Sequence, residues 1–230
     1  MSNIFNKGLL LIISSPSGAG KTSICKKLID EIDGIDLSVS VTTRKKRKDE
    51  IEGKHYFFKN EDEFRILLNE NQFLEHANVF GCLYGTLKQE VVSKINKGID
   101  VIVDIDWQGT RQIAKQLPKD VVKVFILPPS MKELENRLGK RASENKENFK
   151  KRMSEAKKEI SHYTEYDFVI VNNDLQLAVD QIKLILFSER LRMYRQLNLN
   201  KTIEKLIWFL NWVDFFSYFT KVNNRQIFGS

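Results

Sequence analysis

A lysine and a threonine stand side by side at the end of a glycine-rich segment, Ser15-Pro16-Ser17-Gly18-Ala19-Gly20-Lys21-Thr22. An apolar run over 9–13 precedes the segment, and a stretch with helical spacing follows it. When such a turn joins a strand to a helix, its backbone N–H groups can cradle phosphate oxygens. Lys21 then neutralises the terminal phosphates, and the Thr22 hydroxyl binds Mg²⁺. Ser15 replaces the first glycine of the pattern G-x-x-x-x-G-K-[ST], but the remaining spacing is intact. We therefore predict a nucleoside triphosphate site rather than a plain turn with an exposed lysine.

A basic run over 44–48, "RKKRK", has the chemistry to bind a second phosphate group. Arg44 and Arg47, three residues apart on a loop, could converge on one phosphate as planar donors. Tyr56 and Tyr84 could add hydroxyl donors. The alternative is a solvated basic loop or a nucleic-acid patch, and we favour it for the three lysines of the run.

Carboxylates and further arginines complete the set of residues that could act on phosphates. Asp104 and Asp106 close the apolar run 101–103, where a carboxylate can bind the water shell of Mg²⁺. Arg137, Arg141 and Arg152 lie in a charged stretch. Mobile arginines stabilise the charge that spreads over a transferred phosphoryl group, although charged helix faces with i,i+4 pairs are the alternative. The histidines and the two cysteines show no metal-ligand spacing.

Short apolar runs that alternate with helical stretches must position these residues. The runs 9–13, 101–103, 121–127 and 168–171 are rich in β-branched residues, which predicts strands of a parallel sheet covered on both faces. Helices are predicted over 21–31, 61–69, 89–96 and 131–140, and Asn60 and Ser130 each precede a glutamate by three residues, as N-caps do. The alternation indicates an α/β architecture with right-handed crossovers.

Two segments interrupt the alternation of strands and helices. Residues 40–88 contain a strand-like run over 55–58, and residues 137–163 are charged and carry no strand pattern. Ligands of α/β sheets bind beyond the carboxyl ends of the strands, so we expect these insertions to form a substrate pocket or a lid.

Composition narrows the class of protein without identifying it. The chain has 230 residues, 42% of them hydrophobic and 29% charged, as in ordinary globular proteins. Two cysteines without a disulfide pattern favour the cytoplasm. The net charge of +7 would suit nucleic acid, an anionic membrane or phosphorylated small molecules. Nucleic acid is the weakest of these, because the basic residues cluster where small phosphorylated ligands would bind.

Several of these segments, in this order, resemble guanylate kinases. The motifs are "SVSVTTRKKR" (38–47), "GKHYFF" (53–58), "FLEHANVFGCLYGT" (73–86), "DIDWQG" (104–109), the arginines of "RLGKR" (137–141) and "VIVNND" (169–174). The resemblance covers 8–196 and implies a P-loop NTPase three-layer α/β fold with a parallel central sheet, a GMP-binding insertion and a mobile lid. It implies ATP-dependent phosphorylation of GMP and dGMP, with Mg²⁺, by direct in-line transfer in purine nucleotide metabolism.

The resemblance also implies roles for individual residues. ATP would be bound by Ser15, Pro16, Ser17, Gly18, Ala19, Gly20, Lys21, Thr22, Ser23 and Asn172. GMP would be bound by Ser40, Arg44, Arg47, Tyr56, Glu75, Tyr84, Thr86, Asp104 and Asp106. Thr22 and Asp104 would hold the metal, and the catalytic residues would be Lys21, Arg44, Arg137, Arg141 and Arg152. The family's lid usually continues as Gly-Thr-Glu after its second arginine, where this chain has Ala142.

Glu75 is the residue whose chemistry best selects the base. Guanine presents two adjacent donors, N1–H and the 2-amino group, which a carboxylate can accept together, whereas adenine presents an acceptor at N1. A buried mismatch of this kind costs roughly 1–3 kcal/mol. By resemblance, the hydroxyls of Ser40 and Thr86 lie near the same base.

Two other functions compete with an ATP-dependent guanylate kinase. A scaffold that uses the GMP pocket for phosphorylated peptides would not need Lys21, Thr22 or the lid arginines, and a P-loop kinase for another acceptor would not need Glu75. The expected domain spans 1–197, followed by an aromatic-rich extension over 198–230. Its apolar stretch over 205–219 is too short, and too interrupted by Asn211 and Asp214, to span a bilayer. We favour its packing on the core or pairing with another subunit over a membrane surface, so a monomer or a homodimer is expected.

Overall fold

The computed structural model describes residues 6–79, 81–141, 146–210 and 212, with the side chains of 140–152 left out. The chain divides into two compact units. One comprises Lys7–Arg190, and the other comprises Leu191–Ser230 together with Met1–Asn6. All the residues predicted to bind nucleotides belong to the first unit.

A parallel sheet forms the centre of the first unit. Its strand order is β2-β7-β1-β8-β9, and every pair of neighbours is parallel. All residues of the central strand β1 are buried, which explains its uninterrupted apolar sequence. The four predicted strands are confirmed, and the short edge strand β2 was not predicted. The bounds are β1 Leu10–Ser14, β2 Ile35–Leu37, β7 Asp100–Asp104, β8 Val121–Leu127 and β9 Phe168–Val171.

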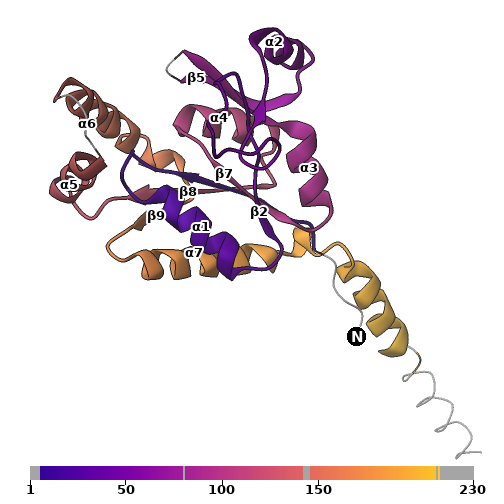
Figure 1. Ribbon diagram of the computed structural model, residues 1–230. Helices are drawn as coiled ribbons and strands as arrows, with labels where there is room; N and C mark the ends of the chain where they lie inside the picture. Colours follow the sequence, from indigo (N-terminus) through magenta and orange to yellow (C-terminus); the bar gives the residue numbers. More distant parts are fainter. Residues whose placement is uncertain (1–5, 80, 142–145, 211, 213–230) are drawn as a thin grey trace, which may run out of the picture. The chain divides into compact units, whose positions relative to one another are not determined.

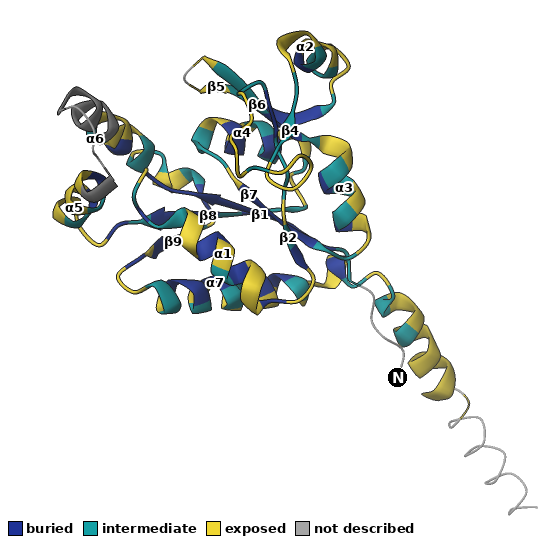
Figure 2. Ribbon diagram, viewed as in Figure 1, coloured by how far each residue is buried: buried dark blue, intermediate teal, exposed yellow. Residues whose placement is uncertain are grey.

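Helices cover both faces of this sheet and make three layers (Figures 1 and 2). Successive residues of β1 contribute to opposite faces: Leu11 and Ile13 pack in the core with α1 and α7, whereas Leu10 and Ile12 pack in the core with α3 and α4. The predicted helices α1 and α3 are confirmed, and α4 and α7 are additional. The bounds are α1 Lys21–Glu31, α3 Lys88–Asn96, α4 Trp107–Gln116 and α7 Leu175–Arg190.

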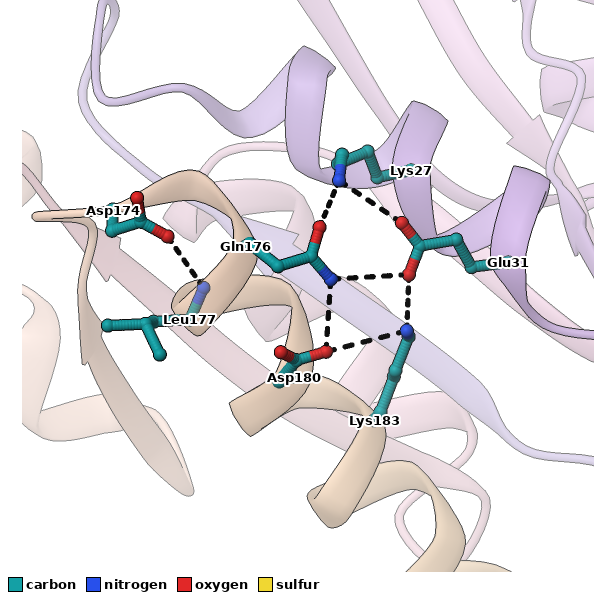
Figure 3. Close-up of polar contacts among 7 residues, drawn as sticks. All are labelled: Lys27, Glu31, Asp174, Gln176, Leu177, Asp180 and Lys183. Atoms are coloured by element: carbon teal, nitrogen blue, oxygen red, sulfur yellow. Dashed lines mark hydrogen bonds and ion pairs between the residues drawn. The ribbon is translucent and has the colours of Figure 1, made fainter.

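A polar network joins α1, the helix that follows the glycine-rich loop, to α7 (Figure 3). Glu31 of α1 accepts hydrogen bonds from Lys27 and Lys183, and Gln176 of α7 bonds to both Lys27 and Asp180. The two lysines hold the pKa of Glu31 well below its usual range, at about 2. The network therefore holds α1 against α7, in addition to the apolar core beneath it.

The segment predicted as the first insertion folds into a second sheet. Its strand order is β4-β3-β6-β5, with β3 parallel to β4 and the other pairs antiparallel. Helix α2 packs on it through Phe64, which stacks on Phe73 with ring centroids 4.6 Å apart. Asn60 and Glu63 form the predicted capping box. The strand expected over 55–58 is shorter than predicted. The bounds are β3 Val41–Thr42, β4 Phe57–Phe58, α2 Glu61–Asn69, β5 Phe73–Val79 and β6 Cys82–Leu87.

The second predicted insertion consists of two helices, α5 (Met131–Arg141) and α6 (Lys146–Ile160), with the short helix η1 (Tyr163–Glu165) after them. The Ser130 hydroxyl accepts a hydrogen bond from the backbone N–H of Glu133 at 3.1 Å, which confirms Ser130 as the N-cap of α5. Leu134 and Leu138 of α5 pack with Ala156 of α6. The side chains of the two helices thus form a small core of their own.

The second unit contains the short helix η2 (Met193–Arg195) and a helix over 199–210. An antiparallel bridge joins Asn6 to Gln196 within it. Its apolar side chains include Leu206, Trp208 and Phe209, which are all more than half exposed. Among the described residues, no helix is both long enough and apolar enough to cross a membrane.

Candidate nucleotide site

The glycine-rich loop runs from the carboxyl end of β1 into α1 and needs glycine for its backbone conformation. Gly18 and Gly20 have φ values of 90° and 103°, in the left-handed region that side chains disfavour. A Cβ on Gly20 would also lie 2.4 Å from Nδ2 of Asn172. That amide is buried and donates to the carbonyl of Ala19 at 2.7 Å, so Asn172 supports the loop backbone. The loop surrounds a cavity of about 220 Å³, lined by Ser15, Pro16, Ser17, Gly18, Gly20, Lys21, Thr22 and Glu159.

The side chain of Lys21 points to the end of β7. Its Nζ lies 2.6 Å from Oδ1 of Asp104. Burial lowers the pKa of Lys21, but the charge and hydrogen bond of Asp104 outweigh this effect and raise it. Lys21 is therefore a fully charged cation beside the phosphate-binding loop, paired with the carboxylate that the sequence predicts as a magnesium ligand.

A buried carboxylate lies in the second sheet, at the position predicted to read the base. Glu75 on β5 faces Thr86 on β6, and the Thr86 hydroxyl donates to Oε1 of Glu75 at 2.6 Å. Glu75 is 5% exposed, and burial, aided by the charge of Asp106, raises the pKa of Glu75 to about 7. A Cβ on Gly109 would lie 3.1 Å from Oε2 of Glu75. The glycine in α4 thus gives this carboxylate its room.

Three of the residues predicted for the acceptor phosphate lie together on the same sheet and the loop beside it. The guanidinium of Arg44 lies 5.4 Å from the ring centre of Tyr56, and the Tyr56 and Tyr84 rings are 6.0 Å apart. Arg44 is held by Glu50 through two hydrogen bonds, of 3.1 and 2.5 Å, which raise the pKa of Arg44. Glu50 also accepts from the backbone N–H of Arg47, at 2.7 Å. We call Arg44, Tyr56 and Tyr84 the arginine–tyrosine cluster.

The remaining predicted residues lie at the edges of these two regions. Ser40 is half-buried beside β3, and Arg47 is exposed. Asp106 caps α4: its Oδ1 accepts from the backbone N–H groups of Gln108 and Gly109, each at 2.9 Å. Arg137 pairs with Glu133 on its own helix, at 2.8 Å. The side chains of Arg141 and Arg152, and residue Ala142, lie outside the described residues.

Four residues contribute to the site without having been given a role from the sequence. Glu50 binds Arg44, Gly109 makes room for Glu75, and Glu159 lines the loop cavity. His162, which follows α6, stacks on Trp107 with ring centroids 3.8 Å apart. Of these four, only Gly109 could have been noticed in the sequence. It lies in the first turn of α4, where a glycine does not serve to end the helix and therefore needs another explanation. Glu159 and His162 act through contacts between distant segments, whereas Glu50 acts within its own loop, on Arg44 and Arg47.

Comparison with known proteins agrees with this geometry. A family model described as "Guanylate kinase" matches residues 7–189. The guanylate kinase of Hyphomonas neptunium is 45% identical over 201 residues, which are 87% of this chain and 93% of that protein. The guanylate kinase of Cereibacter sphaeroides is 49% identical over 191 residues, 83% of this chain and 90% of that protein.

A solved structure extends the similarity to the fold. The crystal structure of guanylate kinase from Anaplasma phagocytophilum superposes with a TM-score of 0.70 at 38% sequence identity, covering 86% of this chain and 95% of that one. The parallel sheet, the glycine-rich loop and the match across residues 7–189 lead to one conclusion: this chain belongs to the guanylate kinase family.

Proposed function

We propose that this member of the guanylate kinase family transfers the γ-phosphoryl group of ATP to GMP or dGMP, with the glycine-rich loop as donor site and the second sheet as acceptor site. The observation that carries this proposal is the position of Asp104. Its carboxylate pairs with Lys21 of the donor loop at 2.6 Å, and its charge also acts on Tyr56 of the arginine–tyrosine cluster. Two groups of side chains that would bind phosphates thus interact electrostatically with one carboxylate at the end of β7.

At the glycine-rich loop, where ATP would bind, the site offers two oxygen ligands, from Thr22 and Asp104, and one cation, Lys21. Lys21 would exchange Asp104 for the outer phosphates of ATP, which frees that carboxylate. Thr22 and Asp104 are hard oxygen donors of the kind that Mg²⁺ accepts, and no described residues form a cluster of three acidic, histidine or cysteine side chains that could hold a metal alone. Thr22 and Asp104 would hold the ion beside the loop that would bind the phosphates. When bound, Mg²⁺ neutralises charge on the phosphates.

The acceptor end supplies cations for the GMP phosphate. Arg44 and Arg47 would take that phosphate, with the hydroxyls of Tyr56 and Tyr84 as further donors. The Glu50 carboxylate holds Arg44 and the backbone of Arg47. The GMP phosphate would therefore bind an arginine whose orientation an anionic partner already fixes, which lowers the cost of placing it.

Glu75 would select the base in its ionised form. Both carboxylate oxygens are then acceptors for the two adjacent donors of guanine, while Thr86 holds one of them in place at 2.6 Å. The hydroxyl of Ser40 would donate to the guanine O6, and Asp106 would lie near the base or the ribose. Adenine would leave this buried carboxylate facing a lone pair, which costs roughly 1–3 kcal/mol.

No covalent intermediate is required for the transfer. A GMP phosphate oxygen would attack the γ-phosphorus of ATP in line, and Lys21 with Arg137, Arg141 and Arg152 would stabilise the charge on the transferred group. Closure of α5 and α6 over the site would bring these arginines in and exclude water. Catalysis by this chain is thus positioning and electrostatic stabilisation.

ADP release with GMP, AMP, CMP or UMP as acceptor tests this proposal. We expect activity with GMP, its loss in Lys21→Ala and its strong reduction in Glu75→Ala. Glu135→Gln, an exposed change on α5, is the matched control. GMP binding without ADP release would contradict the transfer and favour a scaffold role.

The subunit state, the location and the extension over 198–230 stay predictions. We propose that the chain acts on free nucleotides in the cytoplasm, and that the extension packs on the core or pairs with a second copy. Deleting 200–230 and measuring mass in solution tests the pairing. An unchanged mass would contradict it.

A further inference from the structure

One side of helix α4 supports the pocket that would read the guanine base. Gly109 lies against the Glu75 carboxylate, where an added Cβ would meet Oε2 at 3.1 Å. One turn later, the side chain of Gln112 exchanges two hydrogen bonds with the backbone of His76, the neighbour of Glu75, each of 3.1 Å. Gln116 donates to two backbone carbonyls of β5, at 3.2 and 2.9 Å. These contacts fix where β5 holds Glu75 relative to α4.

The first turn of α4 carries a second set of contacts, with the segment that follows the lid helix α6. The imidazole of His162 stacks on the indole of Trp107, with ring centroids 3.8 Å apart and 12° between the planes. The Arg111 guanidinium and the Lys158 ammonium lie 4.6 and 5.7 Å from the centre of the same indole. Glu165 accepts two hydrogen bonds from Arg111, of 2.7 and 2.6 Å, and lies 2.7 Å from Nδ1 of His162. We call Trp107, Arg111, His162 and Glu165 the lid junction.

The helical period places these two sets of contacts on different sides of α4. Trp107 and Arg111 are one turn apart, as are Gly109 and Gln112. At 3.6 residues per turn, the first pair and the side that bears Gly109, Gln112 and Gln116 point roughly 150° apart. A third side packs in the core of the parallel sheet through Ile113. Because one hydrogen-bonded helix carries all three, the lid junction and the base pocket are held in a fixed relation to each other.

We propose that Trp107 and His162 are positioning residues, which set the lid arginines relative to bound GMP by holding the end of α6 on α4. The inference rests on the proposed function, because it concerns the transfer step. The lid junction is the fixed end about which α5 and α6 would close over the site. Neither ring needs to touch a substrate for this role.

The length of α6 makes the transfer sensitive to the lid junction. Arg152, one of the arginines proposed to stabilise the transferred group, precedes Ile160, the last residue of α6, by eight positions. This separation is about 12 Å along the helix axis. A rotation of α6 by about 5° at the junction would therefore displace the helix at that position by about 1 Å. A misplacement of about 1 Å can lower a rate by about 100-fold, so a small loss of alignment at the stack is enough to slow the transfer.

Steady-state kinetics of ADP release by the full-length protein test the proposal, with His162→Ala as the main variant. We expect kcat to fall about tenfold, while the KM values for GMP and ATP change by less than about twofold. His162→Phe keeps a flat ring for Trp107 and should restore kcat to within about twofold of the parent value. His162→Asn keeps a hydrogen-bonding group for Glu165 without a ring and should not restore it. Tyr163→Ala, which removes the adjacent and exposed aromatic side chain, is the matched control and should leave kcat unchanged.

The partner ring separates a specific contact from two independent defects. Trp107→Ala should lower kcat as His162→Ala does, and the double variant should lose no more than either single variant, because each removes the same stack. A parent-like kcat in His162→Ala, a raised KM for GMP at unchanged kcat, rescue by asparagine instead of phenylalanine, or losses that multiply in the double variant would overturn the proposal. A parent protein that releases no ADP with GMP would refute the proposed function and this inference together.

Discussion

Replacing Glu75 with glutamine should make the free protein more stable while it damages the use of GMP. The side chain is 5% exposed and its pKa in the folded protein is about 7, compared with 4.5 for an unperturbed glutamate. Each unit of difference corresponds to about 1.4 kcal/mol, so ionising Glu75 costs the folded state about 3 kcal/mol more than the unfolded chain at pH 8.

The sign of this effect fixes its pH dependence. Because burial raises the pKa of Glu75, the stability that its protonated form contributes is fully present below pH 4.5 and is lost as the pH rises through 7. Glutamine is uncharged at every pH, and its amide oxygen can still accept the hydrogen bond from Thr86. We expect Glu75→Gln to raise the free energy of unfolding by about 3 kcal/mol at pH 8 but by only about 1 kcal/mol at pH 5.5.

Urea unfolding followed by circular dichroism, at both pH values and without nucleotide, measures the effect. Glu135→Gln, an exposed glutamate on α5, should change stability by less than about 0.5 kcal/mol at either pH. In the same preparation, kcat/KM for GMP should fall about 100-fold in Glu75→Gln, because the amide nitrogen meets the donors of guanine. A destabilised Glu75→Gln protein at pH 8, or an equal change at both pH values, would refute the reasoning.

Three further predictions follow from the same contacts. The KM for GMP of the parent protein should rise about fourfold from pH 8 to 6.5, because protonating Glu75 removes an acceptor for guanine. Initial rates at saturating ATP measure this, and a KM for GMP that does not change with pH would contradict it. Gly109→Ala should lower kcat/KM for GMP about tenfold, since its Cβ would lie 3.1 Å from Oε2 of Glu75, whereas Gly139→Ala, with open space around its Cβ, should leave it unchanged. Asn172→Ala should raise the KM for ATP about tenfold, because the loop carbonyl of Ala19 loses its buried donor; an unchanged KM would show that the loop holds its shape without it.

The sequence predicts the framework because its central elements have strong local signals. The run 9–13 is apolar at every position, and β1 is buried at every position, as a strand between two helical layers requires. Helix α4 was missed because its N-cap, Asp106, was interpreted only as a ligand. Helix α7 was also missed. Its start is marked only by Asp174, whose side chain accepts a hydrogen bond from the backbone N–H of Leu177, and this residue had been interpreted as the end of the motif over 169–174.

Contacts between distant segments explain what could not be predicted in the site. The pairing of Glu75 with Thr86 depends on the register of β5 against β6, which includes a shift between Phe73 and Glu75. The position of Glu159 in the lining of the loop cavity depends on how α6 packs. Neither follows from residue types and spacing, because both need the tertiary arrangement first.

The position of β1 in the sheet has a consequence for synthesis of the chain. This strand is made first, but Leu10 pairs with Val101 on one side and with Val121 on the other. At about 5–20 residues per second, these partners leave the ribosome roughly 5–20 s after β1 does. The β5–β6 hairpin, by contrast, pairs within a short segment and can form as it emerges.

During that interval the chain carries an apolar strand with two unpaired edges. Such a segment is a template for pairing with another nascent chain. The arrangement that buries β1 at the centre of the finished sheet therefore leaves this strand open to misassembly on the ribosome, and a chaperone that acts early would protect it.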